Sequence, residues 1–243
     1  MTNTKGTTMP QIDDAELFGN AEDQHAYEDF CANQEAVEKF TLDKPALVCR
    51  WRMSNKKVPM LNRHIRALSE RLVQGEPLTH NMLSWAKQHV EWSLAEGDYT
   101  ARDGVLMLVI DINGNAAMTV GEYEPLADTS AKALRARSAE ARSEADETGV
   151  APELLAAVND GELAFVAPAD ECLCGTATLI EQLAQTKDIP VTRVDIPAQL
   201  KGALFLVSDE HGVVPADDTD AAEADAATVA FFADGYEKLR ARR

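Results

Sequence analysis

The sequence predicts an α/β fold made of two α+β lobes, each with its own sheet. The segment Gly104–Ile112 reads GVLMLVIDI and ends at the turn signal Asn113-Gly114, which is typical of a strand buried on both faces. A second apolar run of strand length, Ala203–Val207, is followed by a polar loop. Helical patterns separate the two runs, so we expect them to be central strands of two different sheets.

The composition fits a water-soluble chain that buries a core and keeps an acidic surface. The 243 residues are 45% hydrophobic and carry a net charge of −18. That charge argues against nucleic acid and anionic membranes as partners, because both are also anionic. No apolar run approaches about 18 residues, and the N-terminus lacks the apolar core of a signal peptide. We therefore expect a cytoplasmic protein that contacts no nucleic acid and no membrane.

Cysteine usage gives no sign of a metal site. The four cysteines fit a reduced compartment. Cys172 and Cys174 form a lone C-x-C pair, which is a poor zinc signature without a second pair. We expect both to be small buried apolar residues, and we expect no metal.

Three regions are predicted along the chain. Residues 1–24 are polar and are interpreted as a flexible N-terminal arm. Residues 25–124 form the first lobe. Residues 125–243 form the second lobe, and the two are expected to meet near residues 121–127.

In the first lobe, periodicity predicts helices and strands in alternation. Tyr27–Phe40 is interpreted as a short helix, and Ala46–Met53 alternates apolar and polar residues as a half-buried strand does. A helix with a basic outer face is predicted from Leu61 to Leu72. Thr79 is a good N-cap for the next helix. The strand Gly104–Ile112 then turns back on itself.

In the second lobe, the pattern begins with an alanine-rich and charged helix, ends with another helix, and places a sheet between them. Ala127–Gly149 is interpreted as a helix that covers the core, and Asn159-Asp160-Gly161 is a strong hairpin signal. The C-terminal helix is expected to bury an apolar stripe. The elements predicted between them are strands at Glu153–Val158, Glu162–Val166, Val191–Ile196, Ala203–Val207 and Val213–Pro215, and a helix from Gly175 onward.

The segment from Cys172 to Pro215 resembles the C-terminal half of fold-type IV aminotransferases. The resemblance lies in the turn Cys174-Gly175-Thr176, the strand entry Ile189-Pro190-Val191 and the loop Ser208-Asp209-Glu210-His211-Gly212. This family contains branched-chain and D-amino-acid aminotransferases and aminodeoxychorismate lyase. The resemblance implies a two-lobed class IV fold, pyridoxal phosphate (PLP) as cofactor, an amino acid or keto acid as substrate, and a homodimer.

The resemblance also implies roles for six residues. Lys132 stands where the family has the lysine that forms an imine with PLP. Gly175 and Thr176 stand in the turn that receives the cofactor phosphate, and Ser208 could add a hydrogen bond from the opposite loop. The two remaining candidates are Arg66 for partial contact with the phosphate and His211 for the substrate carboxylate.

Three departures from the family pattern support a different hypothesis. Ala67 stands where the family has its phosphate-binding arginine, and Phe165 stands where it has the glutamate that pairs with the ring nitrogen. The family also has a strand pair before its phosphate-binding turn. This pair is missing here, where only Ala167–Leu173 precedes the turn. The sequence therefore leaves two hypotheses open. The first is a PLP-dependent aminotransferase or related lyase, because a lysine and a Gly-Thr turn stand at matching places, and the alternative is a non-catalytic, cofactor-free binding or dimerisation module. For a homodimer, we expect Trp51, Trp85 and Trp92 to supply apolar surface.

Overall fold

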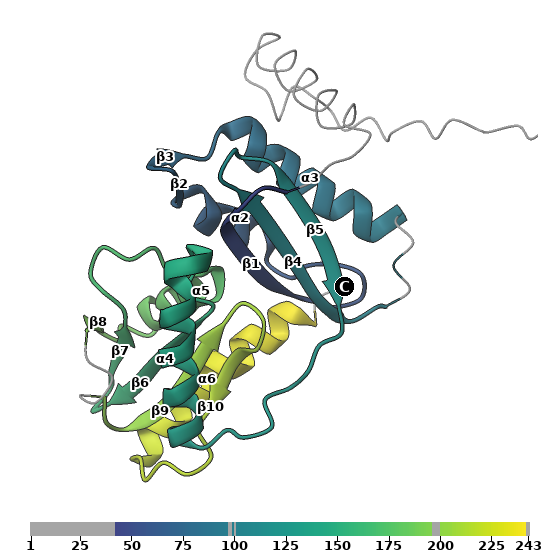
Figure 1. Ribbon diagram of the computed structural model, residues 1–243. Helices are drawn as coiled ribbons and strands as arrows, with labels where there is room; N and C mark the ends of the chain where they lie inside the picture. Colours follow the sequence, from purple (N-terminus) through teal and green to yellow (C-terminus); the bar gives the residue numbers. More distant parts are fainter. Residues whose placement is uncertain (1–41, 97–98, 100, 196–199, 242–243) are drawn as a thin grey trace, which may run out of the picture. The chain divides into compact units, whose positions relative to one another are not determined.

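The computed structural model describes residues 42–96, 99, 101–195 and 200–241. The predicted arm at 1–24 and the helix expected at Tyr27–Phe40 lie outside the described residues. Within them, two larger sheets and the helices that cover them make up the fold (Figure 1). Residues Leu42–Arg243 form one unit by their contacts, so the boundary expected between lobes near residues 121–127 stays a prediction.

The first sheet is antiparallel and has the order β1-β4-β5. β1 (Pro45–Met53) pairs with β4 (Gly104–Asp111), which pairs on its other side with β5 (Ala116–Gly121). The alternation predicted for β1 is confirmed, because every second residue from Leu47 to Met53 is buried. The apolar run at Gly104 is the middle strand, as its composition indicates.

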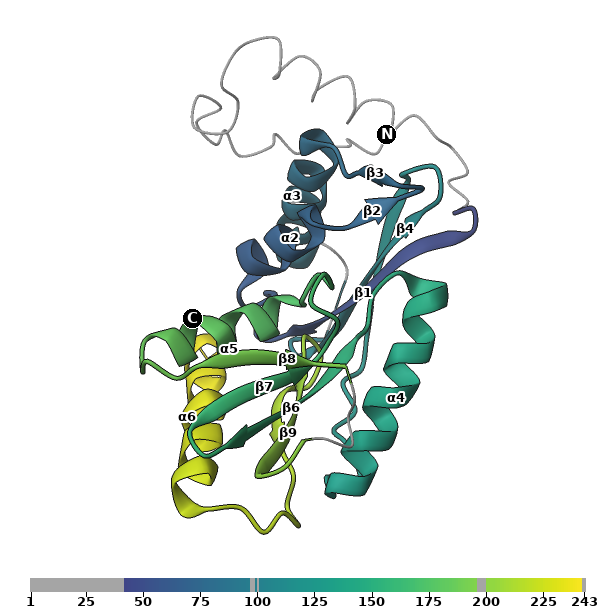
Figure 2. The same ribbon diagram turned by 90° about the vertical axis from the view of Figure 1, so that its left-hand side faces the viewer.

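Two helices lie on one side of the first sheet (Figure 2). α2 (Leu61–Ser69) ends three residues earlier than the sequence predicts, because the chain turns through Gln74 and Gly75 at positive φ and pairs β2 (Leu72–Val73) with β3 (Glu76–Pro77). α3 (His80–Glu96) begins as predicted, with Met82 N donating to the Thr79 hydroxyl at 3.2 Å. Together these helices cover the apolar face of the sheet.

The second sheet has the order β10-β9-β6-β7-β8. Its pairs are antiparallel except for the parallel pair of β7 with β8. β9, the second apolar run, is an interior strand as expected, although β6 is the middle one. The strands are β6 (Glu153–Asn159), β7 (Glu162–Val166), β8 (Val191–Val194), β9 (Ala203–Ser208) and β10 (Gly212–Pro215).

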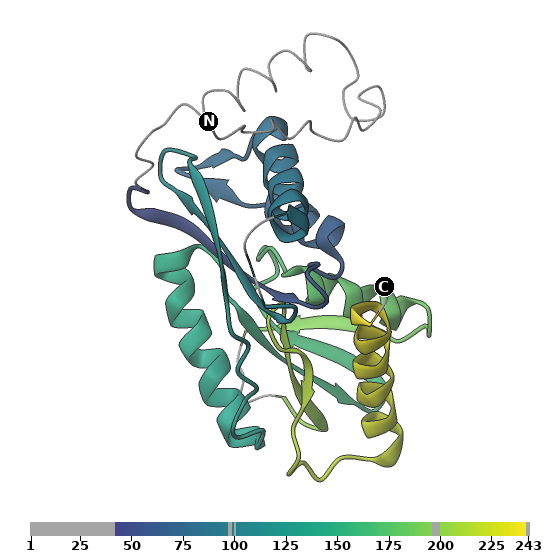
Figure 3. The same ribbon diagram turned by 90° about the vertical axis from the view of Figure 1, so that its right-hand side faces the viewer.

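Helices cover both faces of the second sheet (Figure 3). α4 (Ala131–Thr148) packs Leu134 against one face. α5 (Gly175–Gln185) and α6 (Glu223–Arg240) pack against the other, where Phe205 and Phe232 are fully buried. Removing a side chain such as Phe232 from this layer should cost about 3–5 kcal/mol in free energy of unfolding.

Local signals at the ends of these elements explain where they begin and end. The Ser130 hydroxyl accepts from Ala133 N and caps α4. Gly149 closes α4 at φ 64, where a Cβ would lie 2.5 Å from the Ala46 carbonyl oxygen. No helix among the described residues is both long enough and apolar enough to span a bilayer.

Candidate functional site

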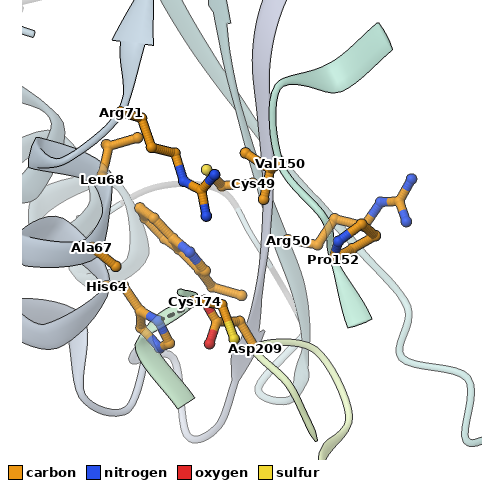
Figure 4. Close-up of a pocket in the computed structure, with 11 residues that line it drawn as sticks. Cys49, Arg50, His64, Ala67, Leu68, Arg71, Val150, Pro152, Cys174 and Asp209 are labelled. Carbon is orange, nitrogen blue, oxygen red and sulfur yellow. Dashed lines mark ion pairs between the residues drawn. The ribbon is translucent and has the colours of Figure 1, made fainter. Parts of the chain in front are cut away.

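A small pocket lies where the first sheet and α2 meet α5 and the turn between β9 and β10 (Figure 4). Its walls are mainly apolar, while Asp209 and His64 face each other at one end. The cavity volume is about 20 Å³, which is room for about one water molecule. The lining residues are Cys49, Arg50, Trp51, His64, Ala67, Leu68, Arg71, Val150, Pro152, Cys174 and Asp209.

The N-terminus of α5 is the chemically distinctive part of this pocket. The N-cap residue, Cys174, has an extended backbone, and a thiol is a weak capping group. The side chain of Asp209 caps the helix instead. Gly175 N donates to its Oδ2 at 3.2 Å, and Thr176 N donates to its Oδ1 at 2.7 Å. A carboxylate therefore occupies the positive end of the helix dipole.

The turn between β9 and β10 holds Asp209 in this position. The Ser208 hydroxyl accepts from Glu210 N and from His211 N, and Arg52 N donates to the Asp209 carbonyl oxygen at 2.8 Å. Gly212 closes the turn at φ 76, where a Cβ would lie 2.3 Å from the Tyr236 ring. The backbone of the turn is thus held by contacts that do not involve the Asp209 carboxylate.

His64 of α2 supplies the charge that faces Asp209. Its Nδ1 lies 3.1 Å from Asp209 Oδ2, and its Nε2 lies 3.1 Å from the Pro59 carbonyl oxygen. A carbonyl oxygen only accepts, so Nε2 carries a proton. Nδ1 faces a carboxylate that already accepts two backbone N–H groups. A proton on Nδ1 would place a positive charge 3.1 Å from this carboxylate, which makes His64 and Asp209 a buried ion pair when the ring is protonated.

The surroundings of His64 favour this close contact. The ring stacks on Trp51, with 5.4 Å between centroids and 18° between planes. It also lies so close to Gly175 that a Cβ there would be 2.5 Å from Nδ1. Only glycine at position 175 lets α2 bring the ring to the start of α5.

The electrostatic balance at Asp209 follows from these contacts. Burial by itself raises the pKa of a carboxyl group. The opposing charge of His64, with the donors of His64 and Thr176, outweighs burial and lowers the pKa of Asp209 to about 2. Asp209 is therefore ionised at neutral pH, and the helix end carries a permanent anion.

Three of the six residues implied by the resemblance lie at this site. Gly175 and Thr176 form the start of α5, and Ser208 precedes Asp209 in the turn. In this structure the backbone N–H groups of Gly175 and Thr176 bind Asp209, and the Ser208 hydroxyl accepts from its own turn. The roles that the resemblance implies for them stay predictions.

The other three candidates do not line the pocket in the described part of the chain. Lys132 is exposed in the first turn of α4, at a helix end that Asp217 and Asp218 bind, and Arg66 is exposed on α2. The His211 side chain is 2% exposed, and its Nε2 lies 3.4 Å from Glu153 Oε1. A catalytic role for Lys132 stays a prediction.

Sequence reasoning missed two buried charge clusters that flank the same turn. One is the pair of His64 and Asp209. The other joins Glu153 to His211 and to Arg137, whose Nε donates to Glu153 Oε1 at 2.9 Å. The residues of each cluster are far apart in the chain, so no local motif reveals them. The only available signal was that a histidine and several charged residues stood in otherwise apolar segments.

The two residues that depart from the family pattern are part of the packing. Ala67 is 6% exposed and lines the pocket, and Phe165 is fully buried against α5 and α6. Among the described residues, no group of three or more His, Cys, Asp or Glu is placed to hold a metal ion. Burial also raises the pKa of the Cys49 thiol to about 12, which makes it a poor metal ligand and a poor nucleophile.

PLP does not fit the site in this arrangement. Its phosphate would need the backbone N–H groups of Gly175 and Thr176, which the Asp209 carboxylate occupies. Two anions on the same donors would repel each other in a buried site. The available space is also far below the roughly 300 Å³ of a typical cofactor pocket.

Comparison with solved structures shows the fold. A protein provisionally named as a 4-amino-4-deoxychorismate lyase aligns with 80% of this chain and 94% of its own, at 13% identity and a TM-score of 0.56. A fold IV transaminase from Curtobacterium pusillum aligns with 85% of this chain and 92% of its own, at 15% identity and a TM-score of 0.52. A hypothetical aminotransferase from Mycobacterium tuberculosis in a PLP-bound form aligns with 84% of this chain and 95% of its own, at 11% identity and a TM-score of 0.52.

Searches by sequence give no match. No family model matches the chain, and no curated protein does either. The chain thus shares the architecture of these structures without a match in sequence.

Proposed function

We propose that this chain, which has the fold of the fold-type IV aminotransferases, is a cofactor-free and non-catalytic protein of that fold. It acts as a homodimeric binding module. Amino-group transfer is not its role, because the N–H groups that would bind the PLP phosphate make hydrogen bonds to a side chain of the same protein.

One observation carries the proposal: the Asp209 carboxylate caps α5 at the place where the resemblance puts the cofactor phosphate. The carboxylate is held by two backbone N–H groups and by the His64 ring. Moving it away would leave both the helix end and the His64 ring without their anion inside the protein. PLP would have to bind tightly enough to offset that cost.

The remaining departures support the same proposal. Ala67 provides no charge for a phosphate, and Phe165 provides no carboxylate for a pyridine nitrogen. Lys132 is exposed on α4 and lies outside the pocket lining, away from the groups that would hold the cofactor phosphate.

The homodimer is proposed on the surface of α3. Trp85 stacks on His89 with 4.6 Å between centroids, and Trp92 lies next along the same ridge and is 49% exposed. Trp51 does not contribute, because it is 2% exposed inside its own chain. A second copy that covers this ridge would remove aromatic surface from water.

Light scattering tests the dimer. We expect a mass of twice 26.5 kDa at micromolar concentration, and partial dissociation for Trp92→Ser. A single species of 26.5 kDa would contradict the homodimer and leave the question of PLP open.

The second candidate function is PLP-dependent amino-group transfer, or a related lyase reaction, on an amino acid or keto acid. The fold of its structural neighbours favours it, since one of them is a PLP-bound aminotransferase. Lys132 would then hold the cofactor, and Gly175 and Thr176 would bind its phosphate.

An absorption titration with PLP separates the two functions. Wild-type protein should remain without a protein-bound visible band at any PLP concentration, and borohydride should attach no pyridoxyl group to it. A band that borohydride bleaches and that Lys132→Ala abolishes would establish the second candidate. A band that persists in Lys132→Ala would also overturn the proposal and would direct attention to Lys201.

A further inference from the structure

We infer that the start of α5 is a complete oxyanion-binding site whose ligand is the chain's own Asp209 carboxylate. Removing this carboxylate should create a site for a small free oxyanion, such as inorganic phosphate or a phosphate monoester. The inference deepens the proposed function, because it explains how the fold functions without a cofactor. We call the backbone N–H groups of Gly175 and Thr176, the Thr176 hydroxyl and the His64 ring the α5 oxyanion site.

The first part of the argument is the arrangement of donors. Two consecutive backbone N–H groups of α5 point at Asp209, from Gly175 at 3.2 Å and from Thr176 at 2.7 Å. They belong to a helix of 11 residues, whose dipole favours an anion at this end. His64 approaches the same carboxylate from α2. The donors thus come from two separate elements and converge on one point.

The second part is a buried hydroxyl that the carboxylate does not satisfy. Thr176 is fully buried, and among the described residues its Oγ1 has no hydrogen-bond partner of normal geometry. It lies near enough to Asp209 to help lower the pKa of that carboxyl group. A buried hydroxyl without a partner is unusual, because burying it unpaired is costly.

The shape of the ligand explains this unpaired hydroxyl. A carboxylate has two oxygens, and here Oδ1 accepts from Thr176 N while Oδ2 accepts from Gly175 N and faces His64. The Thr176 hydroxyl makes no hydrogen bond of normal geometry to either oxygen. A tetrahedral oxyanion presents a third oxygen, which could accept from that hydroxyl. The site therefore has one more donor than its present ligand uses.

The third part is that the site can lose its carboxylate without losing its frame. The backbone of Asp209 is held by Arg52 N at its carbonyl oxygen, and the turn is held by the Ser208 hydroxyl. Neither contact involves the Asp209 side chain. In Asp209→Ala the carboxylate leaves a space that joins the small pocket beside it. The space is lined by unpaired donors and by the His64 ring.

The experiment compares wild-type protein with Asp209→Ala and Asp209→Asn in thermal unfolding, at neutral pH and constant ionic strength, with increasing phosphate against chloride. In Asp209→Ala, phosphate should raise Tm with the logarithm of its concentration above Kd, by about 3–6 °C at ten times its Kd. Wild-type protein and Asp209→Asn should show no such shift relative to chloride, because the carboxylate or the amide still fills the site. ³¹P NMR line broadening on the same samples should show binding to Asp209→Ala alone.

Further variants test which groups bind. Adding Thr176→Val to Asp209→Ala should weaken phosphate binding at least threefold, whereas adding the exposed change Arg66→Ala should leave it unchanged. Equal phosphate binding by Asp209→Ala and by Asp209→Ala with Thr176→Val would show that the Thr176 hydroxyl is not part of the site, and would overturn the inference.

Other outcomes are also decisive. If Asp209→Ala unfolds in chloride buffer, its refolding yield becomes the measurement, and recovery with phosphate but not with chloride would support the inference. Failure of phosphate to stabilise or recover Asp209→Ala, while Asp209→Asn folds, would overturn it. That result would leave the proposed function standing if wild-type protein also fails to bind PLP. Imine formation by wild-type protein would overturn the proposed function instead.

Discussion

Two buried carboxylates flank the turn between β9 and β10, and they are neutralised in different ways. Asp209 faces the start of α5 and is held by two backbone N–H groups and the ring of His64. Glu153 lies on β6 and is held by the guanidinium of Arg137 and by the ring of His211. One turn thus supplies an anion to one cluster and a histidine to the other.

The two clusters differ in the kind of group that holds the carboxylate. Side chains provide the partners of Glu153, as in many structural ion pairs. Backbone N–H groups provide most of the partners of Asp209, and these groups belong to the helix end itself and not to particular side chains. Backbone donors at a helix end bind any suitable anion, so here the chain's own carboxylate can stand where a phosphate would.

The largest expected effect comes from removing the counter-charge of Asp209. His64→Ala leaves a buried carboxylate without its histidine partner and removes the ring that stacks on Trp51. We expect a loss of about 3 kcal/mol in free energy of unfolding, measured by urea denaturation. His64→Gln, which keeps a donor, should lose less. Equal stability of His64→Ala and wild type would show that the pair is not neutralised as described.

Gly175→Ala tests the close approach that the pair requires. A Cβ at this position would lie 2.5 Å from His64 Nδ1, so the ring must move away from Asp209. We expect destabilisation of about 2 kcal/mol, although alanine favours a helix more than glycine does. A matched change in the first turn of α4, Lys132→Ala, should be neutral within about 0.5 kcal/mol. A stabilising effect of Gly175→Ala would contradict the geometry.

Acid unfolding separates the two carboxylates. The pKa of Asp209 falls from its ordinary 3.8 to about 2 in the folded protein. The stability it contributes is therefore fully present above pH 3.8 and is lost as the pH falls toward 2, by about 2 kcal/mol in all. The stability of Asp209→Asn should change correspondingly less between pH 4 and 2. A parallel acid profile for both proteins would contradict the lowered pKa.

Arg137→Ala should have a smaller effect on the Glu153 cluster. The Arg137 side chain is 39% exposed, so water can partly replace it at the carboxylate. The pKa of Glu153 is lowered despite burial, through contacts with His211 and Arg137. We expect a loss of about 1 kcal/mol in free energy of unfolding, because His211 remains. A loss larger than that of His64→Ala would reverse the comparison.

The smallest effect is expected for Arg66→Ala. Arg66 is exposed on α2, away from the pocket lining. Its removal should change stability by less than about 0.5 kcal/mol, measured by urea denaturation. A larger change would mean that the outer face of α2 has a partner, for which a second copy of the chain would be the first candidate.

The fold could be predicted from the sequence wherever patterns are local. The apolar run at Gly104, the hairpin signal at Asp160 and the glycine that closes α4 at Gly149 all depend on neighbouring residues, and each of these features forms as predicted. The end of α2 was placed three residues too late, because the small β2–β3 hairpin takes Leu72 from the helical pattern.

The site could be predicted only in part, for a physical reason. The turn that opens α5 and the loop after β9 were both identified, since each has a local signature. The ligand of α5 was not, because Asp209 reaches Gly175 across 34 positions and His64 across 145. A carboxylate in a polar loop looks the same in sequence whether it faces water or a helix end.

A crystal structure of the wild-type protein grown at neutral pH with excess PLP and phosphate tests the central claim most directly. The account predicts both Asp209 oxygens on the N–H groups of Gly175 and Thr176, with His64 Nδ1 beside Oδ2 and no phosphate at the start of α5. Density for a phosphate on those two N–H groups, with the Asp209 side chain turned away, would contradict it.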